Sequence, residues 1–160
     1  MKLNVDGSRD HYKVVSAGCG GVVRDSSGKW VRGFAKKLDS SLEVHQTELE
    51  AILAGLQLVS DMKFKKVVVE SDNKSVVSMV EKSVHPNHPD CVIIQQIRAM
   101  LHRFDWEVKL VAISNTANSV ADKLANNART LSSDDPYQEY SVQPHNCVQF
   151  LQRDGCLSSF

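Results

Sequence analysis

The order of strand-like and helix-like segments is the feature that most constrains the fold of this chain. Three segments with strand character come first, at residues 2–5, 18–24 and 30–35. Turn-forming residues at 25–28 join the second to the third, so consecutive strands are expected to pair antiparallel. Glycines at the start of the second segment indicate that another part of the chain approaches its backbone closely. The later strand candidates alternate with helical stretches, which is typical of parallel crossover connections.

A long helix is predicted after the third strand, because apolar residues between 49 and 59 recur at helical spacing. Ser40 or Ser41 is expected to cap it, and it should run to about residue 62. The remaining expected elements are a strand at 65–70, a helix from Asn73 or Ser71 to about 82, a helix at 91–104, a strand at 106–113, and a helix from Asn118 or Ser119 to about 129. We therefore predict an α/β domain with a five-stranded mixed sheet. Three antiparallel strands come first, then parallel crossovers, with helices on both faces.

The last part of the chain differs in character from the rest. Residues 130–160 are rich in Ser, Asp and Gln and contain Pro136 and Pro144. Such a composition predicts a flexible C-terminal tail after a single domain at residues 1–129. Phe150 and Leu151 are the candidates for docking this tail onto the domain.

Composition narrows the class of protein. The chain has 160 residues, of which 42% are hydrophobic and 24% charged, as in ordinary globular domains. No apolar stretch is long enough to span a bilayer, and we expect neither a membrane partner nor a signal peptide. The four cysteines show no CxxC spacing and predict reduced thiols in an intracellular protein, nuclear or cytoplasmic. Nothing in the sequence argues for an oligomer, so we expect a monomer.

The net charge of zero hides an asymmetry along the chain. Residues 1–129 hold 18 Lys and Arg against 15 Asp and Glu, whereas residues 130–160 hold one Arg against four acids. If acids of the first part bind metal, the remaining surface of that part is basic, which suits a polyanionic substrate. The alternative is an ordinary solvated surface.

Four carboxylates lie beside segments that should be buried. Asp6 ends the apolar run at residues 3–5, Glu48 opens the helical run at 48–53, Asp72 follows the valine-rich strand, and Asp122 lies within the last helix. A buried unpaired carboxylate is costly, and crowded like charges raise one another's pKa. A shared divalent metal cluster is therefore the leading interpretation, with unrelated surface acids as the alternative.

Four motifs carry these acids in a recognisable order. They read VDGS at residues 5–8, TELEA at 47–51, ESDN at 70–73 and NSVADKLA at 118–125. Together they resemble the type 1 ribonuclease H family, and in particular the plant reverse-transcriptase-like, retrotransposon-related domains. The resemblance covers about residues 2–129 and leaves the tail outside.

The resemblance implies an endonuclease that hydrolyses the RNA strand of RNA–DNA hybrids by a two-metal-ion mechanism. It implies two Mg²⁺ ions, with Mn²⁺ as a substitute, held by Asp6, Glu48, Asp72 and Asp122. In the family pattern Asp6 bridges both ions, Asp122 serves the ion on the side of the attacking water, and Glu48 and Asp72 hold the other.

Substrate contacts are also implied by the resemblance. Gly7, Ser8 and Asn73 match family positions near the minor groove of the hybrid, and Asn118 matches a polar position close to the last acid. Small polar side chains and backbone amides can recognise the 2′-hydroxyl that separates RNA from DNA.

The chain departs from the family pattern in the loop before the last helix. Many members carry a His there, about where this chain has Ala112, and residues 113–117 contain none. Asn115 and Thr116 replace an Arg-Glu pair common in plant-type members. Slower turnover is expected, because general acid–base assistance is worth about 10²–10⁴-fold. The alternative function is a catalytically weak or inactive nucleic-acid-binding domain, and a third is an exonuclease or integrase-like nuclease on a related fold.

Overall fold

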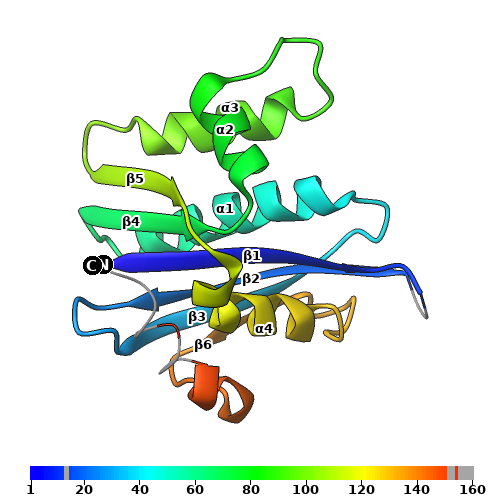
Figure 1. Ribbon diagram of the computed structural model, residues 1–160, viewed down its shortest axis with the longest axis vertical. Coiled ribbons are helices and arrows are strands. Elements are labelled where there is room, and N and C mark those ends of the chain that lie inside the picture. The colour runs from blue at the N-terminus through cyan, green and yellow to red at the C-terminus, as the bar shows by residue number, and fades with distance from the viewer. Residues whose placement is uncertain (13–14, 151–153, 155–160) are drawn as a thin grey trace.

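A six-stranded mixed sheet forms the centre of the computed structural model, which describes residues 1–12, 15–150 and 154 (Figure 1). The strand order is β5-β4-β1-β2-β3-β6. The strands are β1 (Lys2–Asp10), β2 (Ser16–Arg24), β3 (Trp30–Leu38), β4 (Lys66–Ser71), β5 (Glu107–Ala112) and β6 (Tyr137–Tyr140). The helices are α1 (Val44–Asp61), α2 (Lys74–Lys82), α3 (Cys91–Leu101) and α4 (Ser119–Ala128), with short 3₁₀ turns η1 (Asn115–Ala117) and η2 (His145–Cys147).

The pairing of the strands confirms the predicted α/β topology. Strands β1, β2 and β3 form an antiparallel meander, whereas β4 pairs parallel to β1 and β5 parallel to β4. Helices α1, α2 and α3 lie on one side of the sheet and α4 on the other (Figure 1). Strand β1 is therefore central, with α1 packed on one of its faces and α4 on the other.

The start of α1 differs from the prediction. The helix begins at Val44, with Glu43 at the N-cap position, and not directly after Ser40 or Ser41. The side chain of Gln46 accepts a hydrogen bond from the Glu43 N–H at 2.8 Å, so a residue inside the first turn satisfies this backbone group. The predicted cap of α2 is confirmed, because the Asn73 side chain accepts a hydrogen bond from the Val76 N–H at 3.0 Å.

The sixth strand was not predicted. Strand β6 lies in the segment whose composition predicts a flexible tail, and it pairs antiparallel with β3. The indole of Trp30 donates a hydrogen bond to the Tyr140 carbonyl at 3.1 Å, and Arg32 pairs with Glu139 at 3.0 Å. Cross-strand contacts of this kind depend on a distant partner, which the polar composition of the tail does not reveal.

Two apolar clusters hold the layers together. The larger one fills the space between the sheet and α1, α2 and α3, and includes Leu3, Leu49 and Ile94. The smaller one lies by α4 and contains Val22, Val120, Leu124 and Cys147, with Trp30, Tyr140 and Phe150 packed against it. Phe150 thus docks as predicted, whereas Leu151 lies outside the described residues. None of the described helices is long and apolar enough to cross a membrane.

The glycines of β2 allow α4 to lie directly on the backbone of the sheet. A Cβ atom at Gly20 would come within 2.7 Å of the Ala125 nitrogen and of the Leu124 carbonyl carbon. This confirms the close approach predicted from the glycine-rich sequence. The contact also sets how closely α4, which carries Asp122, lies against the sheet.

Replacing Gly20 by Ala should therefore push α4 away from the sheet. We expect Gly20→Ala to lower the free energy of unfolding by about 1–3 kcal/mol, the usual cost of overpacking. Gln57→Ala, on the exposed face of α1, should change it by less than about 0.5 kcal/mol. Urea denaturation followed by circular dichroism measures both, and an unchanged Gly20→Ala protein would contradict the close contact.

Candidate metal-binding site

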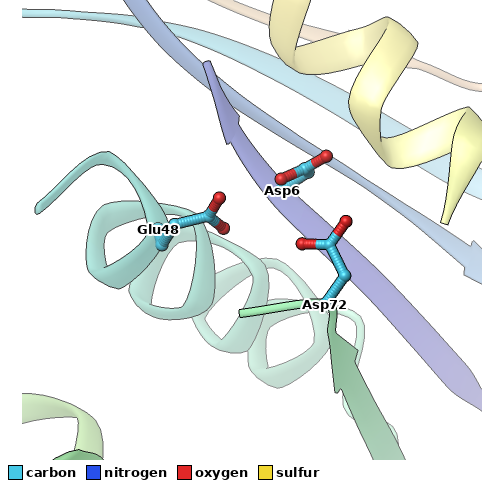
Figure 2. Close-up of side chains that lie close together, drawn as sticks. All are labelled: Asp6, Glu48 and Asp72. Carbon is cyan, nitrogen blue, oxygen red and sulfur yellow. The ribbon is translucent and has the colours of Figure 1, made fainter. Parts of the chain in front are cut away.

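Strand pairing brings two of the predicted acids, Asp6 and Asp72, together. Val5 on β1 is in register with Ser71 at the end of β4, so the next residues, Asp6 and Asp72, lie side by side at one edge of this parallel pair. Glu48 reaches the same place from the first half of α1. Figure 2 shows the three side chains, contributed by β1, α1 and the end of β4, pointing toward one another.

The three carboxylates form a compact group. One oxygen atom from each of Asp6, Glu48 and Asp72 lies within 4.8 Å of the others. Asp6 and Glu48 are each only 5% exposed, whereas Asp72 is half-buried. The group opens into a cavity of about 550 Å³. The cavity is lined by Asp6, Glu48, Asp72, Asn115, Thr116, Ser119, Asp122, Lys123 and Phe150.

A close contact between β1 and α1 holds Glu48 against Asp6. The Gly7 N–H donates hydrogen bonds to Glu48 Oε2 at 3.1 Å and to Asp6 Oδ1 at 2.9 Å. A Cβ atom at Gly7 would lie 2.3 Å from Thr47 Oγ1 and 2.7 Å from the Glu48 nitrogen. Only glycine therefore allows the strand and the helix to approach closely enough for this arrangement.

The electrostatics of the group disfavour ionisation. Burial raises the pKa of Asp6, and the neighbouring charges of Glu48, Asp72 and Asp122 raise it further. Burial likewise raises the pKa of Glu48, against the opposing effect of its hydrogen bonds from Asp6 and Gly7. Burial raises the pKa of Asp72, while a hydrogen bond from Asn118 acts in the opposite direction. These carboxylates are thus held together against their mutual repulsion.

Hard divalent cations fit this donor set. Several carboxylate oxygens converge on one open cavity, and oxygen is the ligand atom that Mg²⁺ and Mn²⁺ prefer. A cation would also offset the repulsion that, after burial, raises the pKa values of the three acids. Asp6, Glu48 and Asp72 are the residues that could hold it.

Asp122 lies at the same cavity but not within the compact group. It is exposed on the first turn of α4, and its carboxylate accepts a hydrogen bond from Asn126 at 3.4 Å. Its charge still acts on the pKa of Asp6, Glu48 and Asp72. Asp122 is therefore close enough to interact with the group, and its role as a ligand remains a prediction.

The predicted substrate residues occupy different settings. Gly7 and Ser8 lie on β1 beside the acids, and Ser8 Oγ contacts Asn126 at 2.5 Å. Asn73 uses its side-chain oxygen to cap α2. Asn118 is completely buried, and its Nδ2 donates a hydrogen bond to the Val5 carbonyl at 2.9 Å. Asn118 thus supports the strand that carries Asp6.

Three further residues at the cavity were missed by the sequence analysis. Ser119 and Lys123 line the cavity from α4. Phe150 lines it from the part of the chain after residue 129, called the C-terminal segment below. The helical spacing of Ser119, Asp122 and Lys123 could have indicated a shared face. No local signal places Phe150 there, because its position depends on the docking of a distant segment.

The loop before α4 contributes Asn115 and Thr116 to the cavity, both on η1. Of the described residues that line the cavity, none is a His. Ala112, which matches the family His in sequence, ends β5 and is not a lining residue. The lack of a His seen in the sequence therefore holds for the cavity as well.

The metal-free protein should gain stability when Asp6 is replaced by its amide, because the fold disfavours ionisation of Asp6 whereas the unfolded chain allows it at neutral pH. We expect Asp6→Asn to raise the free energy of unfolding in EDTA at neutral pH by about 1–2 kcal/mol, as is common when a strained functional site is relieved. The same variant should lose the stabilisation that Mg²⁺ or Mn²⁺ gives the unmodified chain. Thermal unfolding with and without metal measures both effects, and a less stable Asp6→Asn protein in EDTA would contradict the account.

The raised pKa values also determine whether the stability of the metal-free fold rises or falls with pH. In the metal-free fold Asp6 and Glu48 keep their protons to higher pH than in the unfolded chain, where they titrate near pH 4. Their contribution to stability is thus fully present below about pH 4 and is lost as the pH rises through their folded pKa values. Unfolding in EDTA at a series of pH values tests this, with Asp6→Asn expected to show a flatter profile.

Comparison with known proteins agrees with the geometry. The model of the reverse transcriptase-like family matches residues 4–128. A protein of Arabidopsis thaliana, named provisionally as a ribonuclease H protein, is 30% identical over 155 residues. The match covers 96% of this chain and 24% of that protein, so the chain spans about a quarter of the relative's length.

Solved structures share the fold at lower identity. RNase H1 from the archaeon Halobacterium salinarum superposes with a TM-score of 0.69 at 23% identity, covering 79% of this chain and 94% of that one. LC11-RNase H1, isolated from compost and solved with an RNA/DNA hybrid, gives 0.69 at 20% identity, covering 80% and 95%. The foamy virus protease-reverse transcriptase, also solved with a hybrid, gives 0.65 at 17% identity, covering 81% and 20%. The family match and the shared architecture lead to one conclusion: this chain belongs to the reverse transcriptase-like family and has a ribonuclease H-like fold.

Proposed function

We propose that this domain is a metal-dependent endonuclease that hydrolyses the RNA strand of RNA–DNA hybrids. The observation that carries the proposal is the convergence of Asp6, Glu48 and Asp72 on one cavity of a ribonuclease H-like fold. LC11-RNase H1 and the foamy virus enzyme, which share this fold, were solved in complex with RNA/DNA hybrids. This supports the hybrid as the substrate class.

The four acids are the residues that would hold two Mg²⁺ ions, with Mn²⁺ as a substitute. When bound, such a pair supplies a water nucleophile at neutral pH and stabilises charge on the leaving oxygen. Asp6, which has Glu48 and Asp72 as neighbours, would serve both ions. Glu48 and Asp72 would help to hold one ion, and Asp122 would help to hold the other, beside the attacking water.

Residues around the acids suit a sugar–phosphate backbone. Lys123 presents an ammonium group at the cavity that can pair with a phosphate, and Ser119 lies beside it. Gly7 and Ser8 on β1 and Asn73 at the start of α2 would follow the minor groove of the hybrid and recognise 2′-hydroxyls. The buried Asn118 acts indirectly, by holding β1 and contacting Asp72.

A second function, binding of hybrids with weak or no cleavage, is favoured by one observation. The cavity loop offers Asn115 and Thr116, neither of which can move protons near neutral pH as an imidazole does. In this alternative the fold and the metal site persist while turnover is slow. An exonuclease or integrase-like activity is the third possibility, which product analysis separates.

Cleavage of a labelled hybrid tests the proposal. We expect Mg²⁺-dependent products with 5′-phosphate and 3′-hydroxyl ends, formed also on end-blocked substrates. Asp6→Asn and Asp72→Asn should lower the rate by at least about 100-fold, beyond the effect typical of outer-shell residues. Glu81→Gln, an exposed acid on α2, serves as the matched control. Equal rates in all variants would exclude the assignment, whereas binding without cleavage at any Mn²⁺ concentration would favour the second function.

Restoring an imidazole at the cavity should raise turnover. We expect Asn115→His to increase kcat by up to about 10²-fold with little change in KM, because Asn115 lines the cavity and general acid–base assistance acts on the chemical step. Gln57→His, on the exposed face of α1 and outside the cavity lining, is the control and should have little effect. Steady-state kinetics at saturating Mg²⁺ decide the matter, and an equal response of the two variants would argue against a role for this loop in proton transfer.

A further inference from the structure

A carboxylate from the C-terminal segment is buried at the start of the helix that carries Asp122. Asp154 is 0% exposed, and it accepts hydrogen bonds from the Ser119 N–H at 3.0 Å and the Val120 N–H at 2.8 Å. Asn118, at the N-cap position itself, makes no side-chain cap. A residue 34 positions away thus satisfies the first N–H groups of α4.

The charge of the same carboxylate also acts on the pKa of a buried cation, Arg24. Arg24 on β2 is 0% exposed; its Nη2 donates to Asn4 Oδ1 at 2.6 Å, while Nε and Nη1 have no hydrogen-bond partner among the described residues. Burial lowers the pKa of Arg24, and the charges of Asp154 and Glu70 act in the opposite direction. Glu70 also pairs with Lys2 at 3.3 Å, so it shares its charge between two cations.

This buried polar network leads directly to the metal-binding site. Asn4 Nδ2 lies 3.2 Å from both Glu70 Oε1 and Asn118 Oδ1. Asn118 in turn holds the Val5 carbonyl, adjacent to Asp6. At the other end, Asp122 lies in the first turn of the helix that Asp154 caps.

The C-terminal segment also reaches the cavity itself. Phe150, four residues before Asp154, lines the cavity beside the acids and packs against the apolar cluster of α4. The segment lies beyond residues 4–128 matched by the family, so the family pattern assigns it no role.

We infer that Asp154 is a positioning residue of the metal-binding site, which caps α4 and thereby fixes Asp122 relative to Asp6. The inference deepens the proposed function and rests on its metal site. The C-terminal segment would then contribute to the proposed active site through Asp154. Removal of Asp154 should therefore weaken metal binding by about 10-fold or more, the range typical of outer-shell partners.

The test compares variants of the full chain by calorimetric titration with Mn²⁺ alone and by the Mg²⁺ dependence of hybrid cleavage. Asp154→Ala should shift both midpoints to higher metal concentration. Asp154→Asn keeps an acceptor oxygen for α4 but lacks the charge, so it should fold and show a smaller shift in the same direction. Asp134→Asn, an exposed acid of the same segment, is the matched control with no shift.

These readouts separate positioning from mere stability. A purely structural role would lower the melting temperature of the Asp154 variants and leave the Mn²⁺ midpoint unchanged at temperatures where they are folded, which would overturn the inference. If the unmodified chain binds Mn²⁺ but does not cleave hybrids, the proposed endonuclease fails, while weaker Mn²⁺ binding by Asp154→Ala still supports the inference. If the unmodified chain binds no Mn²⁺, both are overturned.

Discussion

The crowding of buried carboxylates around Asp6 is the constraint on which the rest of this structure depends. Asp6, Glu48 and Asp72 repel one another in a poorly solvated place, so the chain must hold them there with rigid elements. The parallel pairing of β1 with β4 fixes two of them, and the glycine contact between β1 and α1 fixes the third. The free energy needed for this arrangement comes from the large apolar cluster between the sheet and α1, α2 and α3. A cation at the site would convert the repulsion into attraction.

A second set of polar groups, linked to the acids through the Val5 carbonyl, is buried and largely hydrogen-bonded. Arg24, Asn4, Glu70 and Asn118 join strands β1, β2 and β4 to the start of α4. Such networks are costly when incomplete, and they specify one arrangement when complete. The C-terminal segment contributes to this part of the molecule through Asp154, and it extends the sheet through β6. The domain is thus built from more of the chain than the region that its family shares.

The sequence revealed the parts of the fold and site that depend on local patterns. The valine run of β4, the cap at Asn73 and the glycines of β2 each act through near neighbours, and each lies where predicted. Motif order placed Asp6, Glu48 and Asp72 in one site because the pairing of β1 with β4 and the packing of α1 on β1 fix their positions. What escaped prediction depends on distant partners: Tyr140 acts through the Trp30 indole, and Asp154 through α4 and Arg24. These partners lie outside the polar segment that contains Tyr140 and Asp154, so its local sequence does not reveal them.

The most direct test of the account is a crystal structure of the full chain grown with Mn²⁺, with anomalous diffraction recorded at the manganese edge. The account predicts two anomalous peaks about 3.5–4 Å apart, the usual spacing of two-metal sites. One should contact Asp6, Glu48 and Asp72, and the other Asp6 and Asp122. An empty cavity at millimolar Mn²⁺, or manganese bound only elsewhere on the surface, would contradict the central claim that these carboxylates exist to hold metal.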